Sequence, residues 1–523
     1  MLSTPGVRVP LRIGRSTQAY LVEAVTQGRS SHLDVIVEVD NMPYGTYFND
    51  RDFHASFTAA VQVASRWRSL ELVSFPPPGT YKDLDITQPL SRLEPLQLRP
   101  DDRLGNPLGL FITALTATPT PHFTVLKVAD PDASFYFVQP ACLHVFASLT
   151  VLKLTCRRMG SPVDILPCLH RLVTFEAHHL HIPIYPLEVH LPLIQTLQFL
   201  RLRSVSIQWM AGQTFPSLQS CHIKFPHHVD ATAFQPVTMP ACYNFMFNSN
   251  DLGHFSLPAL TSLGINSGQW SKWRGNLQLA ILQPIVFASA QSLTHLALQV
   301  QCSEKLLADM LALTPSLELL WLGLASPHAL SKAFFKAFVS RHPSANARIG
   351  KTSKTAAVLC RGLRKLHIHY RRWLRGLEKP EVVRAFGDIV ASRQPDERPD
   401  FSLHLSFDVG PRGQVWKIHE PAKRCNLRSI HCIGYPSPQG AIILSAAPSD
   451  SDFIPPLFRE STYFGTSCYK VPIDFFLSFH NLVELRIYQY LDLKPIAKLQ
   501  YTQGPSCGRV SILAHARSHF LQA

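Results

Sequence analysis

The sequence lacks the features that mark membrane-spanning and exported proteins. Its 523 residues contain no run approaching the roughly 20 consecutive apolar residues of a transmembrane helix. The opening stretch MLSTPGVRVPLRIGRS has no apolar core of signal-peptide length, and no Asn is followed two residues later by Ser or Thr, as N-glycosylation requires. The eleven cysteines are scattered and odd in number, which favours free thiols in a reducing compartment. We therefore expect a cytoplasmic or nuclear protein that does not contact a membrane.

Glycine and acidic residues are scarce relative to proline and basic residues. The chain has 25 Gly against 41 Pro, and 36 Asp and Glu against 50 Lys and Arg, which gives a formal net charge of +14. Proline removes a backbone donor and ends helices, so many short elements are expected. The hydrophobic content of 46% excludes a disordered chain. The length predicts either several domains or one repeat array.

One pattern recurs along the chain: an apolar residue, two variable residues, an apolar residue, one variable residue and an apolar residue. Its clear copies are LTVLKL (149–154), LQFLRL (197–202), LTSLGI (260–265), LTHLAL (293–298), LELLWL (317–322), LRKLHI (363–368) and LVELRI (482–487). Weaker copies begin at Trp67, Leu93, Phe123, Leu172, Leu218, Cys242 and Leu427. Up to residue 260 the copies start 18 to 30 residues apart. Leucine-rich repeats have this strand pattern and a period of roughly 20–29 residues.

The pattern predicts an α/β fold, a leucine-rich-repeat solenoid or horseshoe, with parallel strands on the concave face and irregular short helices outside. The expected regions are a strand and helix cap (1–65), regular repeats (66–326), a basic helical and loop insertion with one repeat strand (327–400), irregular C-terminal repeats (401–502), and a disordered or unrelated tail (503–523). The inward residues of the clear copies should be buried, namely Leu149, Leu152, Leu154, Leu197, Leu200, Leu202, Leu293, Leu296 and Leu298.

The positive charge is concentrated in one segment. Residues 332–384 contain 14 Lys and Arg and two acidic residues, which accounts for most of the net charge. The candidate basic patch consists of Arg361, Arg364, Lys365, Arg371, Arg372 and Arg375. Either this patch binds an acidic partner, phosphate or nucleic acid, or it is a solvated surface that keeps the insertion soluble.

The motifs that resemble enzyme or metal sites are incomplete. GPSCG (504–508) matches G-x-S-x-G, but no acidic residue follows it to complete a triad. ANARIGKT (345–352) has alanine where a phosphate-binding loop needs its first glycine. HHLH (178–181) and HIH (367–369) each offer at most two ligands, whereas a zinc site needs three or four. We therefore predict no enzyme activity, no cofactor and no metal site.

Two further stretches indicate a family. Segment 4–40 is similar to the stretch that follows the F-box in the fungal F-box and leucine-rich-repeat proteins, and ASRWRSLEL (64–72) resembles their Ser-Arg-Trp-x-Ser-Leu first repeat. The later copies LPALTSLGI and QSLTHLALQV have the usual repeat form, so the resemblance covers roughly 4–490. It implies a substrate receptor of a ubiquitin ligase, in which the F-box docks the Skp adaptor and the repeats hold the target. The sequence shows no F-box ahead of segment 4–40, so Skp and cullin are expected as partners only where an F-box lies upstream.

These observations predict a non-catalytic protein-recognition module, with a polyanion binder acting through 332–384 as the alternative. The variable strand residues should point to the concave face, where basic residues and histidine outnumber acids such as Glu176. The candidate partner-binding residues are Lys153, His178, Arg201, Arg203, His222, Lys224, His295, Trp321, Lys365, His367, Arg486 and Tyr488.

The expected partner is a protein with an acidic or phosphorylated segment, and nucleic acid is not expected. Arg201, Arg203 and Lys224 should be the central contacts, with Trp321 as an aromatic anchor. Because the unperturbed pKa of histidine is about 6.5, the histidines on this face predict binding that tightens as the pH falls toward about 6.

Overall fold

The protein is described by a computed structural model, which divides it into two compact units, Met1–Ala259 (unit 1) and Leu260–Ala523 (unit 2). Each unit is described by itself. The described residues are 9–13, 32–37, 50–72, 86, 90–98, 115, 122–129, 143–155, 165–183, 191–224, 234–248, 254–266, 283–299, 304–324, 330–339, 359–370, 389, 402–407, 429–434, 440–445, 484–488 and 510–512.

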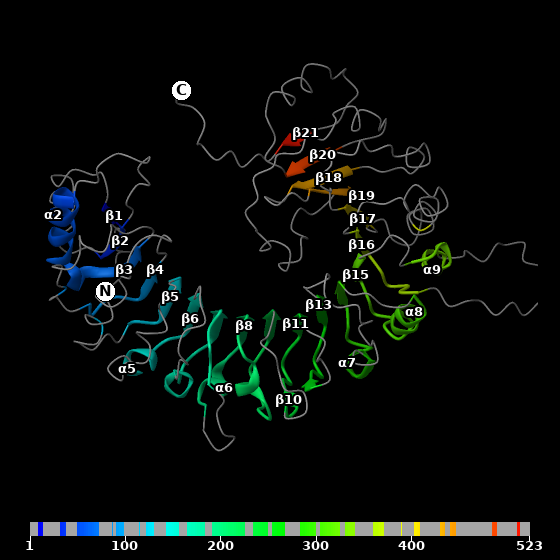
Figure 1. The fold of residues 1–523 in the computed structure, drawn as a ribbon, viewed down its shortest axis with the longest axis horizontal. Helices are drawn as coiled ribbons and strands as arrows, with labels where there is room; N and C mark the ends of the chain where they lie inside the picture. Colours follow the sequence, from blue (N-terminus) through cyan, green and yellow to red (C-terminus); the bar gives the residue numbers. More distant parts are fainter. Residues whose placement is uncertain are drawn as a thin grey trace, which may run out of the picture. The chain divides into compact units, whose positions relative to one another are not determined.

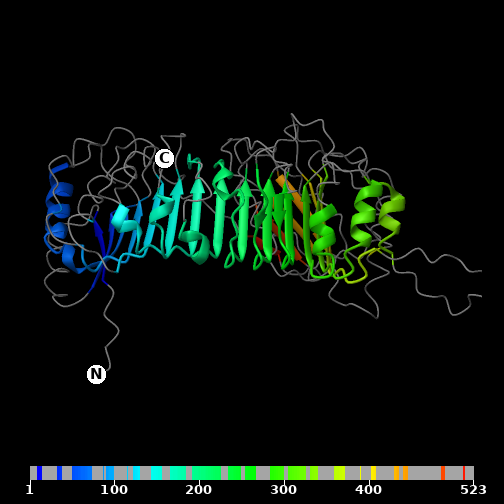
Figure 2. The ribbon, with the colours of Figure 1, turned by 90° about the horizontal axis from the view of Figure 1, so that it is seen from below.

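Unit 1 is a ladder of parallel strands in chain order. The strands are β1 (Val9–Ile13), β2 (Leu33–Val37), β3 (Trp67–Leu72), β4 (Pro95–Leu98), β5 (Val125–Ala129), β6 (Val151–Thr155), β7 (Thr174–His178), β8 (Phe199–Arg203), β9 (Ser220–Lys224) and β11 (Asn244–Asn248). Each strand pairs in parallel with the one before it, and the arrows in Figure 2 point the same way. One short parallel strand per repeat is the architecture of a leucine-rich-repeat solenoid, which confirms the predicted fold class.

Short elements connect the strands of unit 1. They are α5 (Leu143–Phe146), η3 (Leu166–Cys168), α6 (Leu193–Thr196), η4 (Gln208–Met210) and the small parallel pair β10 (Val237–Thr238) and β12 (Phe255–Ser256). Figure 1 shows α5, α6 and β10 on the outer side of the row of strands, as expected for a solenoid. Ahead of β3 lie α2 (Asp50–Val61) and η1 (Ala64–Arg66), so region 1–65 contains both strand and helix.

The repeat pattern gives the position of each strand in unit 1. In the row of parallel repeat strands, each strand from β4 to β9 and β11 begins two residues after the leading apolar residue, as Val151 follows Leu149 and Phe199 follows Leu197. Within a strand, buried and partly exposed residues alternate, because successive side chains point to opposite faces. In both units, all nine leucines that were predicted to lie inside are buried.

A hydroxyl residue ahead of the leading apolar residue links neighbouring repeats. Its side chain donates a hydrogen bond to the carbonyl of the leading residue one repeat earlier. These bonds run from Ser148 to Phe123 (2.7 Å) and from Thr196 to Leu172 (2.7 Å) in unit 1, and from Ser292 to Leu260 (2.8 Å) in unit 2. Carbonyls at such turns would otherwise be buried without a partner, so the hydroxyl completes the contact between repeats.

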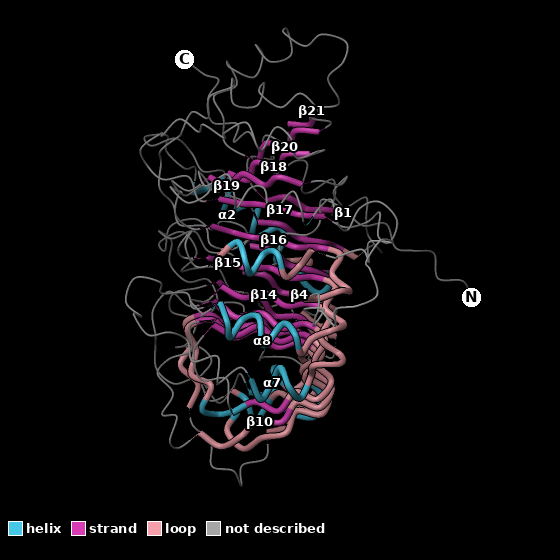
Figure 3. The backbone as a smooth tube through the Cα atoms, turned by 90° about the vertical axis from the view of Figure 1, so that its right-hand side faces the viewer, coloured by secondary structure: helices cyan, strands magenta, loops and turns pink. Residues whose placement is uncertain are grey.

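Unit 2 begins with the same arrangement. The parallel strands are β13 (Ser262–Asn266), β14 (His295–Gln299), β15 (Leu319–Leu324), β16 (Lys365–Tyr370) and β17 (Ser402–Phe407). The helices are α7 (Gln283–Ala288), α8 (Glu304–Ala312) and α9 (Lys332–Lys336). Figure 3 shows α7 and α8 one above the other along this stack, so the outer elements here include longer helices than in the repeats of unit 1. Within the described ranges, no helix is long and apolar enough to cross a membrane.

The C-terminal part of unit 2 departs from the prediction in two places. β18 (Ser429–Gly434) and β19 (Gly440–Ser445) pair antiparallel, because only five residues separate them and a parallel crossover needs a dozen or more. β20 (Glu484–Tyr488) pairs in parallel with β18, and β21 (Val510–Ile512) pairs in parallel with β20. The segment 503–523, predicted to be a disordered or unrelated tail, therefore contributes a strand to the sheet.

Candidate functional site

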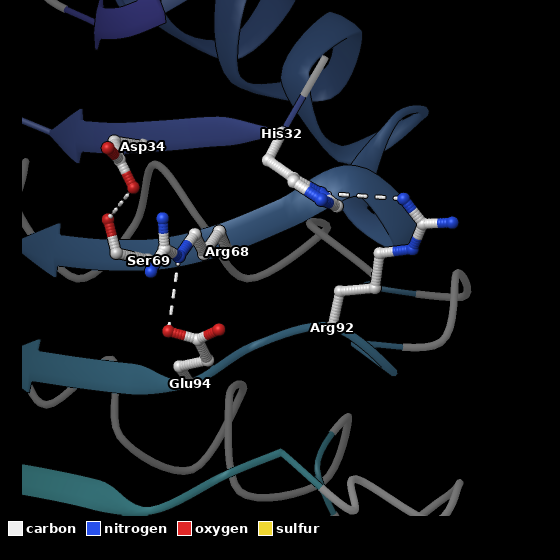
Figure 4. A network of polar contacts seen from close by, with 6 residues as sticks. All are labelled: His32, Asp34, Arg68, Ser69, Arg92 and Glu94. Atoms are coloured by element: carbon white, nitrogen blue, oxygen red, sulfur yellow. Dashed lines mark hydrogen bonds and ion pairs between the residues drawn. The ribbon is translucent and has the colours of Figure 1, made fainter. Parts of the chain in front are cut away.

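Polar side chains on the first strands of unit 1 pair with one another across the strands (Figure 4). Ser69 Oγ on β3 donates to Asp34 Oδ1 on β2 at 2.6 Å. Arg68 Nε donates to Glu94 Oε2 at 3.1 Å in an ion pair whose two side chains are partly buried. Opposite charges and hydrogen-bonding groups that face each other on neighbouring strands stabilise a sheet modestly.

The same pairing continues along the sheet. Gln97 Nε2 on β4 donates to Glu71 Oε1 on β3 at 3.0 Å, and Lys127 Nζ on β5 donates to Gln97 Oε1 at 3.4 Å. Arg92 Nη1 lies 3.4 Å from His32 Nδ1 at the start of these strands (Figure 4). We call the set of cross-strand partners the N-terminal ladder; it consists of Asp34, Arg68, Ser69, Glu71, Glu94, Gln97 and Lys127.

Strands β8 and β9 bring four basic or histidine side chains together. In the parallel register Arg201 lies opposite His222 and Arg203 lies opposite Lys224. Residues two apart in a strand share a face, and paired strands lie about 4.8 Å apart, so the four residues form a two-by-two block that we call the basic array. The sequence predicted this juxtaposition, since all four are among the candidate partner-binding residues.

Glu176 on β7 is the carboxylate beside the basic array. Its Oε2 lies 2.7 Å from Lys153 Nζ, and its Oε1 lies 3.3 Å from His178 Nε2 and 3.6 Å from Arg201 Nη1. Contact with His178, supported by the charges of Lys153 and Arg201, lowers the pKa of Glu176 to about 2 despite its burial. Glu176 is therefore ionised at all ordinary pH values, and three side chains share its charge.

The array is partly withdrawn from water. Lys224 is only 7% exposed, and burial together with the charges of Arg203 and Arg201 lowers its pKa to about 8. Burial, followed by the charge of Arg201, lowers the pKa of His222 to about 3. The pKa of His295 in unit 2 is also lowered, chiefly by burial. The prediction that histidine protonation tightens binding toward pH 6 is therefore wrong for His222, which stays neutral there.

Two nitrogens of the array have no hydrogen-bond partner among the described residues. They are Arg203 Nε and His222 Nε2, and both are buried. A buried donor or acceptor without a partner costs about 1–3 kcal/mol. Such atoms usually have an explanation, such as a ligand or ion that satisfies them.

Strands β7 and β8 end in an unusual backbone conformation. His179 and Ser204, which directly follow β7 and β8, have φ values of 54° and 50°. Their amides donate to the carbonyls of Arg203 and Lys224, both at 2.8 Å. The left-handed region costs a non-glycine residue roughly 1–2 kcal/mol, and strain of this kind is concentrated at functional sites.

The sequence prediction missed the aromatic residue beside the array. Phe199 is 39% exposed and alternates with the buried Leu200, so it shares the outward face of β8 with Arg201. A phenylalanine in a repeat strand suggests a core residue, and only its place in the alternation could have shown otherwise. Tyr243, directly before β11, is a second exposed large aromatic residue in unit 1.

The candidates in unit 2 do not form a comparable surface. Trp321 is only 2% exposed and packs edge-on against His367, which is 8% exposed, with ring centroids 5.8 Å apart. Trp321 was predicted to be an aromatic anchor for the partner, and its ring is buried against neighbouring side chains although its strand position faces away from the core. His295 is exposed and contacts Thr294 Oγ1 at 2.8 Å through Nδ1, and Lys365 is half-buried.

The predicted basic patch is only partly described. Arg361 is exposed, and Arg364 Nε lies 3.8 Å from Glu318 Oε2 in an exposed ion pair. Arg371, Arg372 and Arg375 lie outside the described residues. Arg486 and Tyr488 belong to β20, whose side chains also lie outside those described.

The described residues offer little for covalent or metal chemistry. Within them, no three His, Cys, Asp or Glu side chains are placed to hold a metal ion. Cys221 on β9 and Cys242 just before β11 are free and buried. Burial raises the pKa of Cys242 to about 12 and that of Cys221 well above its usual value. Both therefore stay protonated, and a protonated thiol is a poor nucleophile.

No family model matches the sequence, and no curated protein matches it. Among solved structures, the Toll–Spatzle complex of Drosophila aligns with a TM-score of 0.36 and 12% identity over 81% of this chain. The alignment spans 53% of that chain, or about half its length. A leucine-rich-repeat protein of Leptospira interrogans aligns with a TM-score of 0.32 and 13% identity, over 69% of this chain and 83% of that one.

Proposed function

We propose that this protein is a non-catalytic recognition module that binds a protein partner in unit 1. The partner would bind on the face of strands β6 to β9 that points away from the core. The observation behind the proposal is the basic array beside the exposed Phe199. Arginine and aromatic residues are enriched among the residues that dominate protein interfaces. The strand face of a solenoid is also the surface such proteins use for binding.

The resemblance to F-box and leucine-rich-repeat proteins is consistent with this proposal. In that arrangement the repeats hold a target for ubiquitin transfer, and an F-box upstream docks the Skp adaptor and the cullin. We extend the proposal to this receptor role. The binding face itself is tested independently of any ligase assembly.

The test compares two double variants with equal changes of charge. Arg201→Glu with Arg203→Glu reverses the array, whereas Arg171→Glu with Lys305→Glu reverses two exposed basic residues, one in a turn and one on α8, outside every candidate binding surface. Proteins captured from a lysate by the immobilised wild-type chain are quantified by mass spectrometry, and the strongest is then purified. Its affinity for all three chains is measured by calorimetry.

We expect the purified partner to bind the wild type and the control equally and the array variant at least about tenfold more weakly. A third variant, Phe199→Ser, removes an exposed side chain without changing charge and should also weaken binding. Circular dichroism checks that each variant is folded. Equal affinity for the wild type, the array variant and Phe199→Ser would show that the partner docks elsewhere.

A further inference from the structure

The first residue of each strand from β4 to β8 has an apolar or β-branched side chain on the outward face. In the parallel register these five residues lie opposite one another, strand by strand. Each precedes a buried residue in the alternation, and none of the five is itself buried. We call them the apolar row; it consists of Pro95, Val125, Val151, Thr174 and Phe199.

Polar pairs lie beyond both ends of the apolar row. On one side, Ser220 lies opposite Phe199 and accepts a hydrogen bond from Asn244 Nδ2 at 3.2 Å. On the other side, Ser69 and Asp34 of the N-terminal ladder are joined at 2.6 Å. Because these polar side chains bond to one another, the apolar surface is confined to five strands. Paired strands lie about 4.8 Å apart, so the row is about 19 Å long.

A second outward row lies two residues further along the same strands and is charged. In register it consists of Gln97, Lys127, Lys153, Glu176 and Arg201. Lys153 and Arg201 both contact Glu176. Lys127 contacts the amide oxygen of Gln97 at 3.4 Å, and among the described residues it contacts no carboxylate. Two residues of a strand span about 7 Å, so an apolar strip and a charged strip run side by side across the sheet.

The spacing of the apolar row fits a helix better than an extended segment. Side chains of the row repeat about every 4.8 Å, the distance between paired strands. The apolar stripe of an amphipathic helix repeats once per turn, or about every 5.4 Å. In an extended segment, side chains on one face repeat about every 6.6 Å and are out of step with the row after two strands. A helix of about 13 residues, laid across the strands, covers the whole row.

We infer that the apolar row binds an amphipathic helix of the partner, laid across β4 to β8; this rests on the proposed function. The apolar stripe of that helix packs on the row and reaches Phe199 at one end. Its polar flank lies over the second row, where an acidic side chain above β5 pairs with Lys127. An amphipathic helix that lays its apolar face on a hydrophobic surface is a recurring mode of peptide recognition.

The experiment uses the full chain and two displayed libraries of peptides about 18 residues long. Both libraries have the same number of fixed leucines and random residues elsewhere. In the first library the leucines follow the helical spacing i, i+4, i+7 and i+11, and in the second they occupy every second position. Peptides retained by the immobilised chain are sequenced, and the affinity of the best one is measured by fluorescence anisotropy.

Two matched double variants locate the helix on the strand face. Val125→Gln with Val151→Gln removes apolar surface from the row on β5 and β6. Ala129→Gln with Thr155→Gln places the same side chains at the other end of the outward face of these two strands. A single variant, Lys127→Gln, removes the cation of the second row. Circular dichroism checks that each variant is folded.

We expect the library with helical spacing alone to be retained, with Asp or Glu enriched on one flank of the leucine stripe. Val125→Gln with Val151→Gln should weaken binding of the best peptide by about tenfold or more, since two apolar contacts are lost. Ala129→Gln with Thr155→Gln should leave the affinity unchanged. Lys127→Gln should abolish the acidic enrichment and keep the preference for helical spacing.

Equal retention of the second library, or retention of neither, would overturn the inference, as would unchanged affinity in the Val125→Gln, Val151→Gln variant. A dimer of the wild-type chain in analytical ultracentrifugation that this variant abolishes would also overturn it, because the row would then bind a second copy of the chain. Each of these results leaves the proposed function standing if the purified protein partner still loses affinity for the Arg201→Glu, Arg203→Glu variant. Conversely, helix binding without any effect of Arg201→Glu and Arg203→Glu on the protein partner would refute the proposed docking face alone.

Discussion

The N-terminal ladder and the basic array lie on the same face of unit 1, yet they differ in how their polar atoms are paired. In the ladder, each side chain meets a complementary neighbour, as Glu71 meets Gln97 and Asp34 meets Ser69. In the array, Arg203 Nε and His222 Nε2 are buried without a partner among the described residues. The strands below them are alike, so the difference lies in the outward side chains alone. Paired side chains stabilise the sheet, whereas the two nitrogens of the array could still accept a ligand as their partner.

The first way to test the comparison is to truncate one inward leucine under each region. Leu98 under the ladder and Leu202 under the array are both buried. Leu98→Ala and Leu202→Ala should each lower the free energy of unfolding by about 2–5 kcal/mol, because each leaves a cavity in the core. Denaturant unfolding measures both, with the exposed Arg171→Ala as a control expected within about 0.5 kcal/mol of wild type. A large loss for only one leucine would show that the two regions differ in their cores as well.

The second test removes one negative charge from each region. Glu176→Gln should cost about 1.5–3 kcal/mol, the usual contribution of hydrogen bonds to charged groups, because Lys153 and Arg201 then lose their shared carboxylate. Glu71→Gln should cost less than about 1.5 kcal/mol, since Glu71 accepts from the neutral amide of Gln97 and an amide oxygen can replace it. Thermal unfolding of both variants and the wild type measures the two losses of stability. Equal losses would contradict the inference that Glu176 contributes more to stability than Glu71.

The third test uses pH. The pKa of Glu176 is about 2 in the folded protein and about 4.5 ordinarily, so its stabilisation is complete above 4.5 and is lost as the pH falls toward 2. His222 has a pKa of about 3 when folded against 6.5 ordinarily, so the unfolded chain takes up a proton first and stability falls between pH 6.5 and 3. His222→Gln should flatten the upper window and Glu176→Gln the lower one in denaturant unfolding at stepped pH. Unchanged slopes in both variants would refute these assignments.

The smallest effect is expected from the backbone at the end of β8. Ser204→Gly should raise the free energy of unfolding by about 0.5–1 kcal/mol, because glycine adopts the positive φ of this position without strain. Ser204→Ala is the matched control, since alanine removes the hydroxyl and keeps the Cβ atom. Denaturant unfolding should separate the two. A gain of stability in the alanine variant would assign the effect to the hydroxyl and not to the backbone.

The sequence predicted the strands well because the repeat pattern is local. Each copy, clear or weak, corresponds to a strand that starts at or just after its leading residue. The pattern failed at β17, where Asp400 stands in the leading apolar position, and at β19, which pairs antiparallel through a short connection. A search for leading leucines therefore passes over both strands.

The binding face was harder to predict, because exposure depends on neighbouring repeats. The positions of Arg201, Arg203 and Lys224 follow from the alternation, and the sequence predicted them. The burial of Trp321 does not, since it depends on packing beyond its own strand. The charge balance of Glu176 also depends on three residues from three strands. The repeat pattern alone predicts which face of the sheet a side chain points to and how neighbouring strands align. The packing of neighbouring repeats decides which of these side chains remain accessible to a partner.

The buried thiols near β9 and β11 allow the local opening of these repeats to be measured by alkylation. Cys221 faces the core directly beneath the array, and Cys242 precedes the next strand. Because both thiols are inaccessible and protonated when folded, alkylation by iodoacetamide requires these repeats to open. The labelling rate at Cys221 therefore measures how often the strands under the array separate. Any ligand that bridges Arg203 and Lys224 should slow that labelling in proportion to its occupancy.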